Sequence, residues 1–179
     1  MKKQVGDEKI QKSARFAIVA YLIINFIIMP HSYNRIWIHA IWATKKRMPL
    51  INFSVESTVY QFIAEQLREQ GCSVRIINGM PDHIHCLFLL NRQKSIAEVI
   101  KQIKGSSSHY INHHNLIGDA FFAWQTGYAA YSVSESIVVK VYEYIKNQKS
   151  HHRKKTFEQE YNEFNKFHGI NPSSPKPTT

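Results

Sequence analysis

The sequence predicts one α/β domain of the α+β class, in the ferredoxin-like order β-α-β-β-α-β with an antiparallel sheet and an added C-terminal helix. From Ile36 onward, β-branched and aromatic runs alternate with stretches of helical periodicity. Residues 73–78 and 83–90 are expected strands joined by a turn at 79–82. A chain of 179 residues with 44% hydrophobic residues can build one core.

The first half of the domain is expected to be β-α-β-β. Residues 36–42 are β-branched and aromatic, which favours a strand. Residues 55–70 carry apolar side chains at helical spacing, and Gly71 is placed to end that helix. Residues 73–78 and 83–90 then predict the second and third strands.

The second half supplies the remaining elements. Ser95 is expected to cap a helix that ends near Gly105 or continues toward Ile111. Residues 128–133 predict a weaker fourth strand, and the serine after it is expected to cap a helix over 135–149.

The composition indicates a polyanionic partner. Lys and Arg number 23 against 13 Asp and Glu, which gives a net charge of +10. Such a balance favours nucleic acid first and an anionic membrane surface second. Two cysteines, Cys72 and Cys86, cannot make a disulfide scaffold, so we expect a cytoplasmic protein.

The chain is expected to divide into an apolar extension at 1–30, a working domain at 31–168 and a disordered Pro/Ser/Thr-rich tail at 169–179. The apolar run 16–29 is shorter than the roughly 20 residues of a membrane-spanning helix. Three interpretations stay open: translation truly begins at Met29, the run is membrane-associated, or it is a secretory signal without a convincing cleavage site.

A His-hydrophobic-His pattern lies in the third expected strand. Residues i and i+2 of a strand project from one face, so His83 and His85 point the same way while Ile84 points into the core. Such a pair can hold one metal ion. Because the chain has 10 histidines, the pattern taken alone also arises by chance.

A second pair lies on the last expected helix. Tyr144 and Gln148 are four residues apart and therefore share one helical face. A phenol can attack phosphorus, and an amide oxygen is a neutral hard ligand. By spacing alone, an amphipathic edge tyrosine and a solvated glutamine explain the pair better than a catalytic site does. Tyr142 has Lys146, which is not a ligand, four positions on.

Several separated motifs together resemble the single-tyrosine HUH transposases of the insertion-sequence 200-like type. The resemblance runs from about Ser32 to Phe167 and departs from the family at both ends. Its motifs are, in order, YNRIWIHAIWATKKR (33–47), PDHIH (81–85), KGSS (104–107), WQTGY (124–128), SVS (132–134) and YIKNQ (144–148), followed by His151 and His152.

The resemblance implies a metal-dependent DNA strand transferase. His83 and His85 would bind a divalent ion, Mg²⁺ or Mn²⁺, and Gln148 would complete the protein ligands. Tyr144 would cleave single-stranded DNA, leaving a 5′-phosphotyrosine and a free 3′-OH. Two imidazoles and an amide suit Mn²⁺ or Zn²⁺ better than Mg²⁺ by ligand softness, so phosphate oxygens would have to complete the coordination.

Basic and aromatic residues outside the pair are candidate DNA contacts. Trp124 and Tyr128 would stack on unpaired bases or, equally, pack in the core or an interface. The expected contacts are Lys45, Lys46, Arg47, Lys104, Trp124, Tyr128, Lys149, Arg153 and Lys154. Asp82 is more often a structural turn residue, and Cys86 points to the opposite face from His85, into the core.

The resemblance also implies the partners: single-stranded DNA with imperfect hairpins, and a homodimer in which the Tyr144 helix of one subunit serves the His pair of the other. No membrane partner is expected. Three rivals remain: a domesticated relative, although those usually carry Asn-Pro in place of Asn147-Gln148, a catalytically inactive DNA-binding module, and a membrane-tethered protein.

Overall fold

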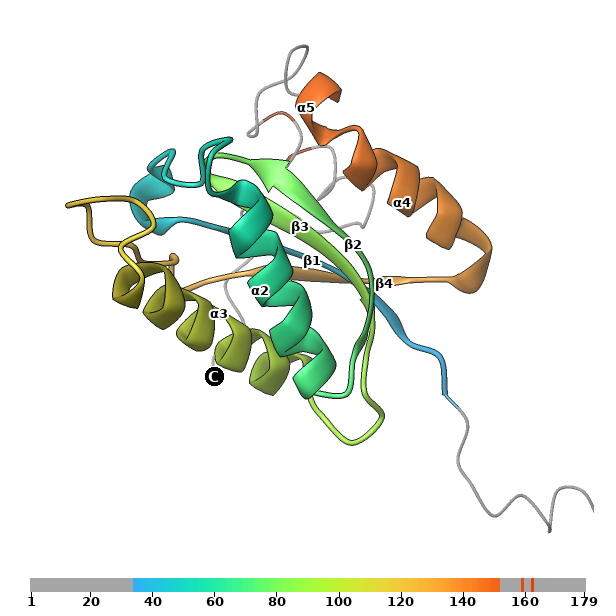
Figure 1. Cartoon of the computed structure of the whole chain (residues 1–179). Coiled ribbons are helices and arrows are strands. Elements are labelled where there is room, and N and C mark those ends of the chain that lie inside the picture. Colours follow the sequence, from blue (N-terminus) through green and yellow to red (C-terminus); the bar gives the residue numbers. More distant parts are fainter. Residues whose placement is uncertain (1–33, 152–158, 160–161, 163–179) are drawn as a thin grey trace, which may run out of the picture. The chain divides into compact units, whose positions relative to one another are not determined.

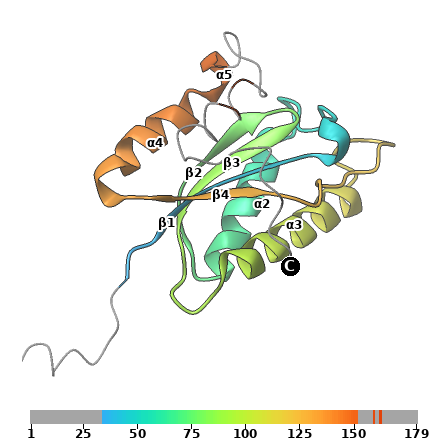
Figure 2. The same ribbon diagram turned by 180° about the vertical axis from the view of Figure 1, so that it is seen from behind.

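A four-stranded antiparallel sheet carries helices on both of its faces (Figures 1 and 2). The computed structural model describes residues 34–151, 159 and 162. The strands, in the spatial order β2-β3-β1-β4, are β1 (Trp37–Ala43), β2 (Ser73–Met80), β3 (His83–Leu89) and β4 (Ala129–Val133). The α-helices are α2 (Glu56–Glu69), α3 (Ile96–His113), α4 (Val138–Lys146) and α5 (Gln148–His151). The predicted order β-α-β-β-α-β is confirmed.

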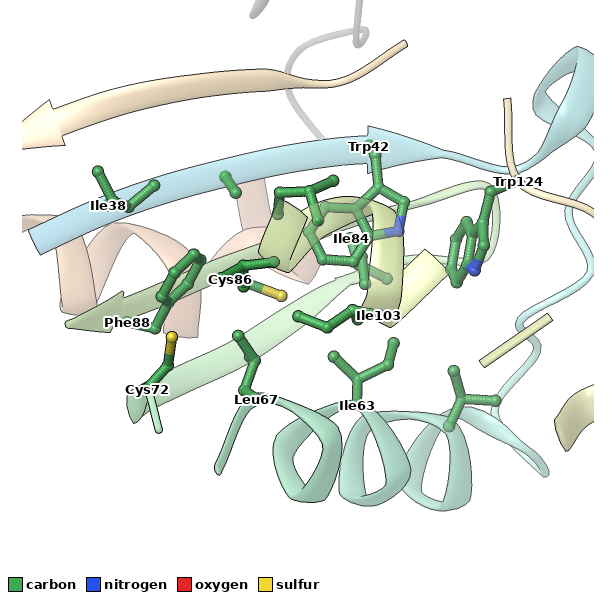
Figure 3. Close-up of a cluster of buried hydrophobic side chains, with 14 of the residues drawn as sticks. Ile38, Trp42, Ile63, Leu67, Cys72, Ile84, Cys86, Phe88, Ile103 and Trp124 are labelled. Atoms are coloured by element: carbon green, nitrogen blue, oxygen red, sulfur yellow. The ribbon is translucent and has the colours of Figure 1, made fainter. Parts of the chain in front are cut away.

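The larger core lies between the sheet and helices α2 and α3 (Figure 3). Alternate residues of β1 and β3 face these helices, because side chains along a strand alternate between its two faces. The side chains that meet there include Ile38, Trp42, Ile84, Cys86 and Phe88 from the sheet and Ile63, Leu67 and Ile103 from the helices. Burial raises the pKa of the Cys86 thiol, as befits the core position predicted for it.

The opposite face of the sheet is covered by α4, which packs on β2 and β3. A smaller apolar cluster there includes Leu87 of β3 and Val138 and Ile145 of α4. Asn78 of β2 fixes the end of this helix, because its amide Nδ2 donates to the carbonyl oxygens of Ile145 at 2.9 Å and Lys146 at 3.0 Å. The buried histidines of β1 and β3 lie on this α4 face.

The helix predicted over 135–149 is broken, and this prediction is wrong in detail. A 3₁₀ turn (Glu135–Ile137) comes first, α4 ends at Lys146, and α5 begins at Gln148. The carbonyls that would accept from residues 149 and 150 in a continuous helix accept from Asn78 instead. Asn147 adds to the break because its side chain donates to the carbonyl of Glu143 at 2.8 Å.

The two predicted serine caps have different outcomes. Ser95 begins α3 with a complete capping box: its hydroxyl accepts from the backbone of Glu98, whose carboxylate accepts from the backbone of Ser95. The helix continues past Gly105 to His113, so the longer alternative is confirmed. Ser134 makes no capping bond, and its hydroxyl meets that of Ser136 at 3.0 Å.

The predicted extension at 1–30 and tail at 169–179 lie outside the residues that the structure describes, and the start and end of the 31–168 domain stay predictions. Between residues 34 and 151, no helix combines the length and apolar character needed to cross a membrane.

Gly79 of β2 leaves no room for a side chain beside the backbone of β3. A Cβ at this position would lie 2.2 Å from the carbonyl oxygen of His83 and 2.8 Å from the Cα of Ile84. We expect Gly79→Ala to lower the free energy of unfolding by about 1–3 kcal/mol or more, since backbone atoms must move. Urea unfolding followed by circular dichroism measures this change.

Gly105→Ala is the matched control for Gly79→Ala. Gly105 lies inside α3 with nothing within 4 Å of the added Cβ, so alanine should stabilise the helix by up to about 1 kcal/mol. Equal effects of the two substitutions would contradict the close approach at Gly79.

Candidate active site

His83 and His85 project from β3 toward α4, and each side chain is only 1% exposed. Their ring centroids are 5.3 Å apart. Each Nδ1 atom is held by a neighbour: Asp82 Oδ1 at 2.6 Å for His83, and His39 Nε2 at 3.0 Å for His85. This makes Nε2 the atom through which either ring would coordinate a cation.

Asp82 joins His83 to a charged residue from another loop. Its carboxylate accepts from His83 Nδ1 and from the guanidinium of Arg47 at 2.5 Å. Burial by itself raises the pKa of this carboxyl, but the hydrogen bond to His83 and the charges of His83 and Arg47 outweigh it, so its pKa lies below the usual value. Asp82 is thus more than the turn residue that sequence reasoning favoured.

Arg47 reaches Asp82 from a tight turn after β1. Lys46 and Arg47 both adopt left-handed backbone conformations, with φ of 58° and 55°. Such conformations are costly for residues other than glycine. The loop is held by Thr44, whose backbone N–H donates to the carbonyl oxygen of Asp82 at 2.9 Å. The turn therefore adopts a strained backbone conformation that places Arg47 beside Asp82.

His39 is the site residue that sequence reasoning missed. It lies on β1, is 1% exposed and stacks on His85 with ring centroids 5.2 Å apart. The alternation of residues 36–42 could have found it: His39 falls on the opposite face from Ile38 and Ala40, whose side chains enter the larger core. Nothing in the local sequence identifies the neighbour that it meets across the sheet.

The ring of Tyr144 contacts His39 and His85. Its ring centroid is 5.9 Å from that of His85 and 6.1 Å from that of His39, and both contacts are nearly perpendicular. The Tyr144 hydroxyl oxygen is buried. Gln148 is fully buried at the start of α5, which contacts β2. The structure thus brings Tyr144 beside His85, one member of the His pair, within the same chain.

Tyr142, the other tyrosine of α4, has a different environment. The guanidinium of Arg75 lies 5.3 Å from its ring centroid, and the ammonium of Lys146 lies 6.0 Å from it.

In the part of the chain that the structure describes, no three His, Cys, Asp or Glu side chains form a group that could hold a metal ion. A cation bound by His83 and His85 would therefore need Gln148 or substrate oxygens.

The expected DNA contacts are distributed over several surfaces. Lys45 and Lys46 are exposed beside Arg47, whereas Lys149 forms an ion pair with Glu56. Arg153 and Lys154 lie outside the described residues.

Trp124 is a packed residue: it is 8% exposed, its Nε1 donates to the Ser107 hydroxyl at 2.9 Å, and its ring meets Trp42 edge-on. The packing alternative thus explains Trp124. Tyr128 is 40% exposed. It lines a hollow of about 330 Å³ with Lys101, Lys104 and Thr126.

Lys104 has its ammonium directed into the protein. Its Nζ donates to the carbonyl oxygens of Gln125 at 2.7 Å, Thr126 at 2.9 Å and Gly127 at 3.1 Å. Burial lowers the pKa of this amine. The three N–H donors of Lys104 are thus used to hold the 125–127 loop against α3, and this explains why the KGSS and WQTGY motifs meet.

Comparisons with known proteins agree with this architecture. A family model described as "Transposase IS200 like" matches residues 32–148. The ISDra2 transposase TnpA of Deinococcus radiodurans is 25% identical over 114 residues, which cover 62% of this chain and 81% of that protein.

Two solved structures have a similar fold. One, a Deinococcus radiodurans R1 protein described as a transposase, has 25% identity and a TM-score of 0.52, and the match covers 66% of this chain and 94% of that one. The other is a REP-associated tyrosine transposase bound to a REP hairpin, with 16% identity and a TM-score of 0.51, covering 68% of this chain and 72% of that one. At this identity the second likeness concerns the fold alone.

Lys104→Met tests whether Lys104 is a structural clamp or a phosphate contact. Three carbonyls lose a charged donor, so we expect the free energy of unfolding to fall by about 1.5–3 kcal/mol. The matched control is Lys101→Met, on the exposed side of the same helix, which should change stability little. Urea unfolding measures the stability of both variants. Unchanged stability in Lys104→Met would contradict a structural role for the Lys104 ammonium.

Proposed function

Because the chain belongs to the IS200-like transposase family, we propose that it cleaves and rejoins single-stranded DNA at the hairpin ends of a small insertion sequence. Tyr144 is the proposed nucleophile, and a 5′-phosphotyrosine is the proposed intermediate. The observation that carries this proposal is the contact of the Tyr144 ring with both His39 and His85 in one buried site.

The proposed reaction exchanges one ester bond for another. The phenol oxygen of Tyr144 attacks phosphorus, the bond from phosphorus to the 3′-oxygen breaks, and that oxygen takes up a proton to become a free 3′-OH. A free phenol has a pKa of about 10 and is mostly protonated at neutral pH, so its proton must leave as it attacks. Since the intermediate is a phosphodiester, a new 3′-OH can displace Tyr144 without nucleotide triphosphate.

A divalent cation fits the side chains beside Tyr144. His83 and His85 are buried, and their Nδ1 atoms are engaged by Asp82 and His39, which suits coordination through Nε2. Gln148 would add a neutral oxygen. A bound cation would polarise the scissile phosphate and stabilise charge on its oxygens. Neutral ligands favour Mn²⁺ over Mg²⁺, unless phosphate oxygens complete the set.

We propose single-stranded hairpin DNA and a second copy of the chain as the partners. The net charge of +10 and the exposed Lys45 and Lys46 beside the site support an anionic backbone as ligand. A dimer with shared sites would require α4 to reach the His pair of the other subunit, whereas here Tyr144 lies beside its own His85.

Tyr144→Phe tests the nucleophile. Phenylalanine keeps the ring that packs on His39 and His85 but lacks the attacking oxygen, so the covalent protein–DNA adduct should disappear while DNA binding remains. The adduct is measured by denaturing gel electrophoresis after incubation with labelled single strands from the element's ends and Mn²⁺ or Mg²⁺. Tyr142→Phe, on the same helix, should still form the adduct; the opposite result would move the nucleophile to Tyr142.

Metal affinity should depend on DNA. With only two imidazoles and an amide from the protein, we expect Mn²⁺ to bind tightly only when phosphate oxygens are present. Titration of Mn²⁺ into Tyr144→Phe, with and without the single-stranded substrate, measures both affinities. Chelation by EDTA should abolish adduct formation by the unsubstituted protein, and added Mn²⁺ should restore it. Equal affinities in the two titrations would contradict the shared coordination.

A further inference from the structure

We infer that His39 and Asp82 are positioning residues for the histidine pair. Each accepts the Nδ1 proton of one histidine, His39 from His85 and Asp82 from His83, so that both rings present Nε2 to a cation. This inference rests on the proposed function, because it concerns the same metal site. It adds two residues that act through His83 and His85 and are not themselves ligands.

With a cation on His85 Nε2, the contact between His39 and His85 would fix the tautomers of both rings. The two nitrogens, His39 Nε2 and His85 Nδ1, are 3.0 Å apart in a buried environment, so one proton lies between them. If His85 binds a cation through Nε2, that proton is on its own Nδ1 and His39 Nε2 accepts it. His39 must then carry its remaining proton on Nδ1 and stay neutral.

Asp82 orients the other ring with a charged acceptor. Its Oδ1 lies 2.6 Å from His83 Nδ1, while Oδ2 is held by Arg47 at 2.5 Å. The guanidinium fixes the carboxylate, and the carboxylate fixes the imidazole. A carboxylate behind a ligating histidine raises the basicity of the ring, whereas a neutral imidazole does so less. His83 is thus the stronger metal ligand of the two histidines.

His39 also contacts the proposed nucleophile. The centroid of its ring lies 5.2 Å from the ring centroid of His85 and 6.1 Å from that of Tyr144. One side chain of β1 therefore touches both a proposed ligand on β3 and the tyrosine on α4. The orientation of His85 relative to Tyr144 depends on a residue that binds neither metal nor phosphate.

Two substitutions separate the hydrogen bond of His39 from its packing. His39→Phe keeps a ring but has no acceptor, whereas His39→Gln keeps an acceptor oxygen and loses the ring. Both are made in the full chain with Tyr144→Phe, and Mn²⁺ affinity is measured by isothermal titration with a single-stranded oligonucleotide present. We expect His39→Phe to weaken Mn²⁺ binding by about 10- to 100-fold and His39→Gln to weaken it much less.

Further variants keep the test decisive. His113→Phe, at an exposed histidine of α3, is the matched control and should bind Mn²⁺ like the parent. Asp82→Ala removes the other acceptor and should also weaken binding by about 10- to 100-fold. Thermal unfolding of each variant identifies any that fail to fold. If one of His39→Phe and Asp82→Ala fails to fold, the other tests the inference.

The outcomes distinguish this inference from the proposed function. If the parent binds no Mn²⁺, or if His83→Ala leaves its affinity unchanged, the metal site itself is wrong and the inference falls with it. If the parent binds Mn²⁺ but His39→Phe and Asp82→Ala bind it equally well, only the positioning role is overturned. If His39→Gln weakens Mn²⁺ binding and His39→Phe does not, the hydrogen-bonding role of His39 is also overturned, because loss of the packing ring alone would explain that result.

Discussion

The antiparallel pairing of β1 with β3 is the constraint on which the rest of the site depends. In this register Ile41 lies opposite His85 and His39 lies opposite Leu87. Side chains alternate along both strands, so the histidines of both share the α4 face while Ile38, Ile84 and Phe88 enter the core on the other. A slip of one residue would bury the histidines among apolar side chains and expose the core.

Features that depend on local periodicity could be predicted from the sequence. The strand pattern around His83 and His85 placed both rings on one face and Ile84 in the core, and the structure confirms this placement. The capping residue Ser95 was recognisable because its partner Glu98 lies only three residues away. Four-residue spacing likewise related Tyr144 to Gln148, although a break at Asn147 now separates their helices.

Features that depend on distant partners could not be predicted. Arg47 and Lys104 look like ordinary basic surface residues, yet one pairs with Asp82 and the other holds three carbonyls of residues 125–127. The break at Asn147 was hidden for the same reason, because Asn78 is 67 residues away from Ile145, whose carbonyl it binds. In each case the sequence specifies the donor, and only the fold specifies the acceptor.

The Asn78 bonds to the last turn of α4 have an evolutionary consequence. Asn78 lies directly opposite His85 in the pairing of β2 with β3, so one hairpin carries the histidine pair and also anchors the helix of Tyr144. The connection between β4 and α4 need not set the distance between tyrosine and histidine. Among descendants of this chain, a change in that connection therefore need not separate the reacting groups, because the hairpin itself holds the last turn of the tyrosine helix.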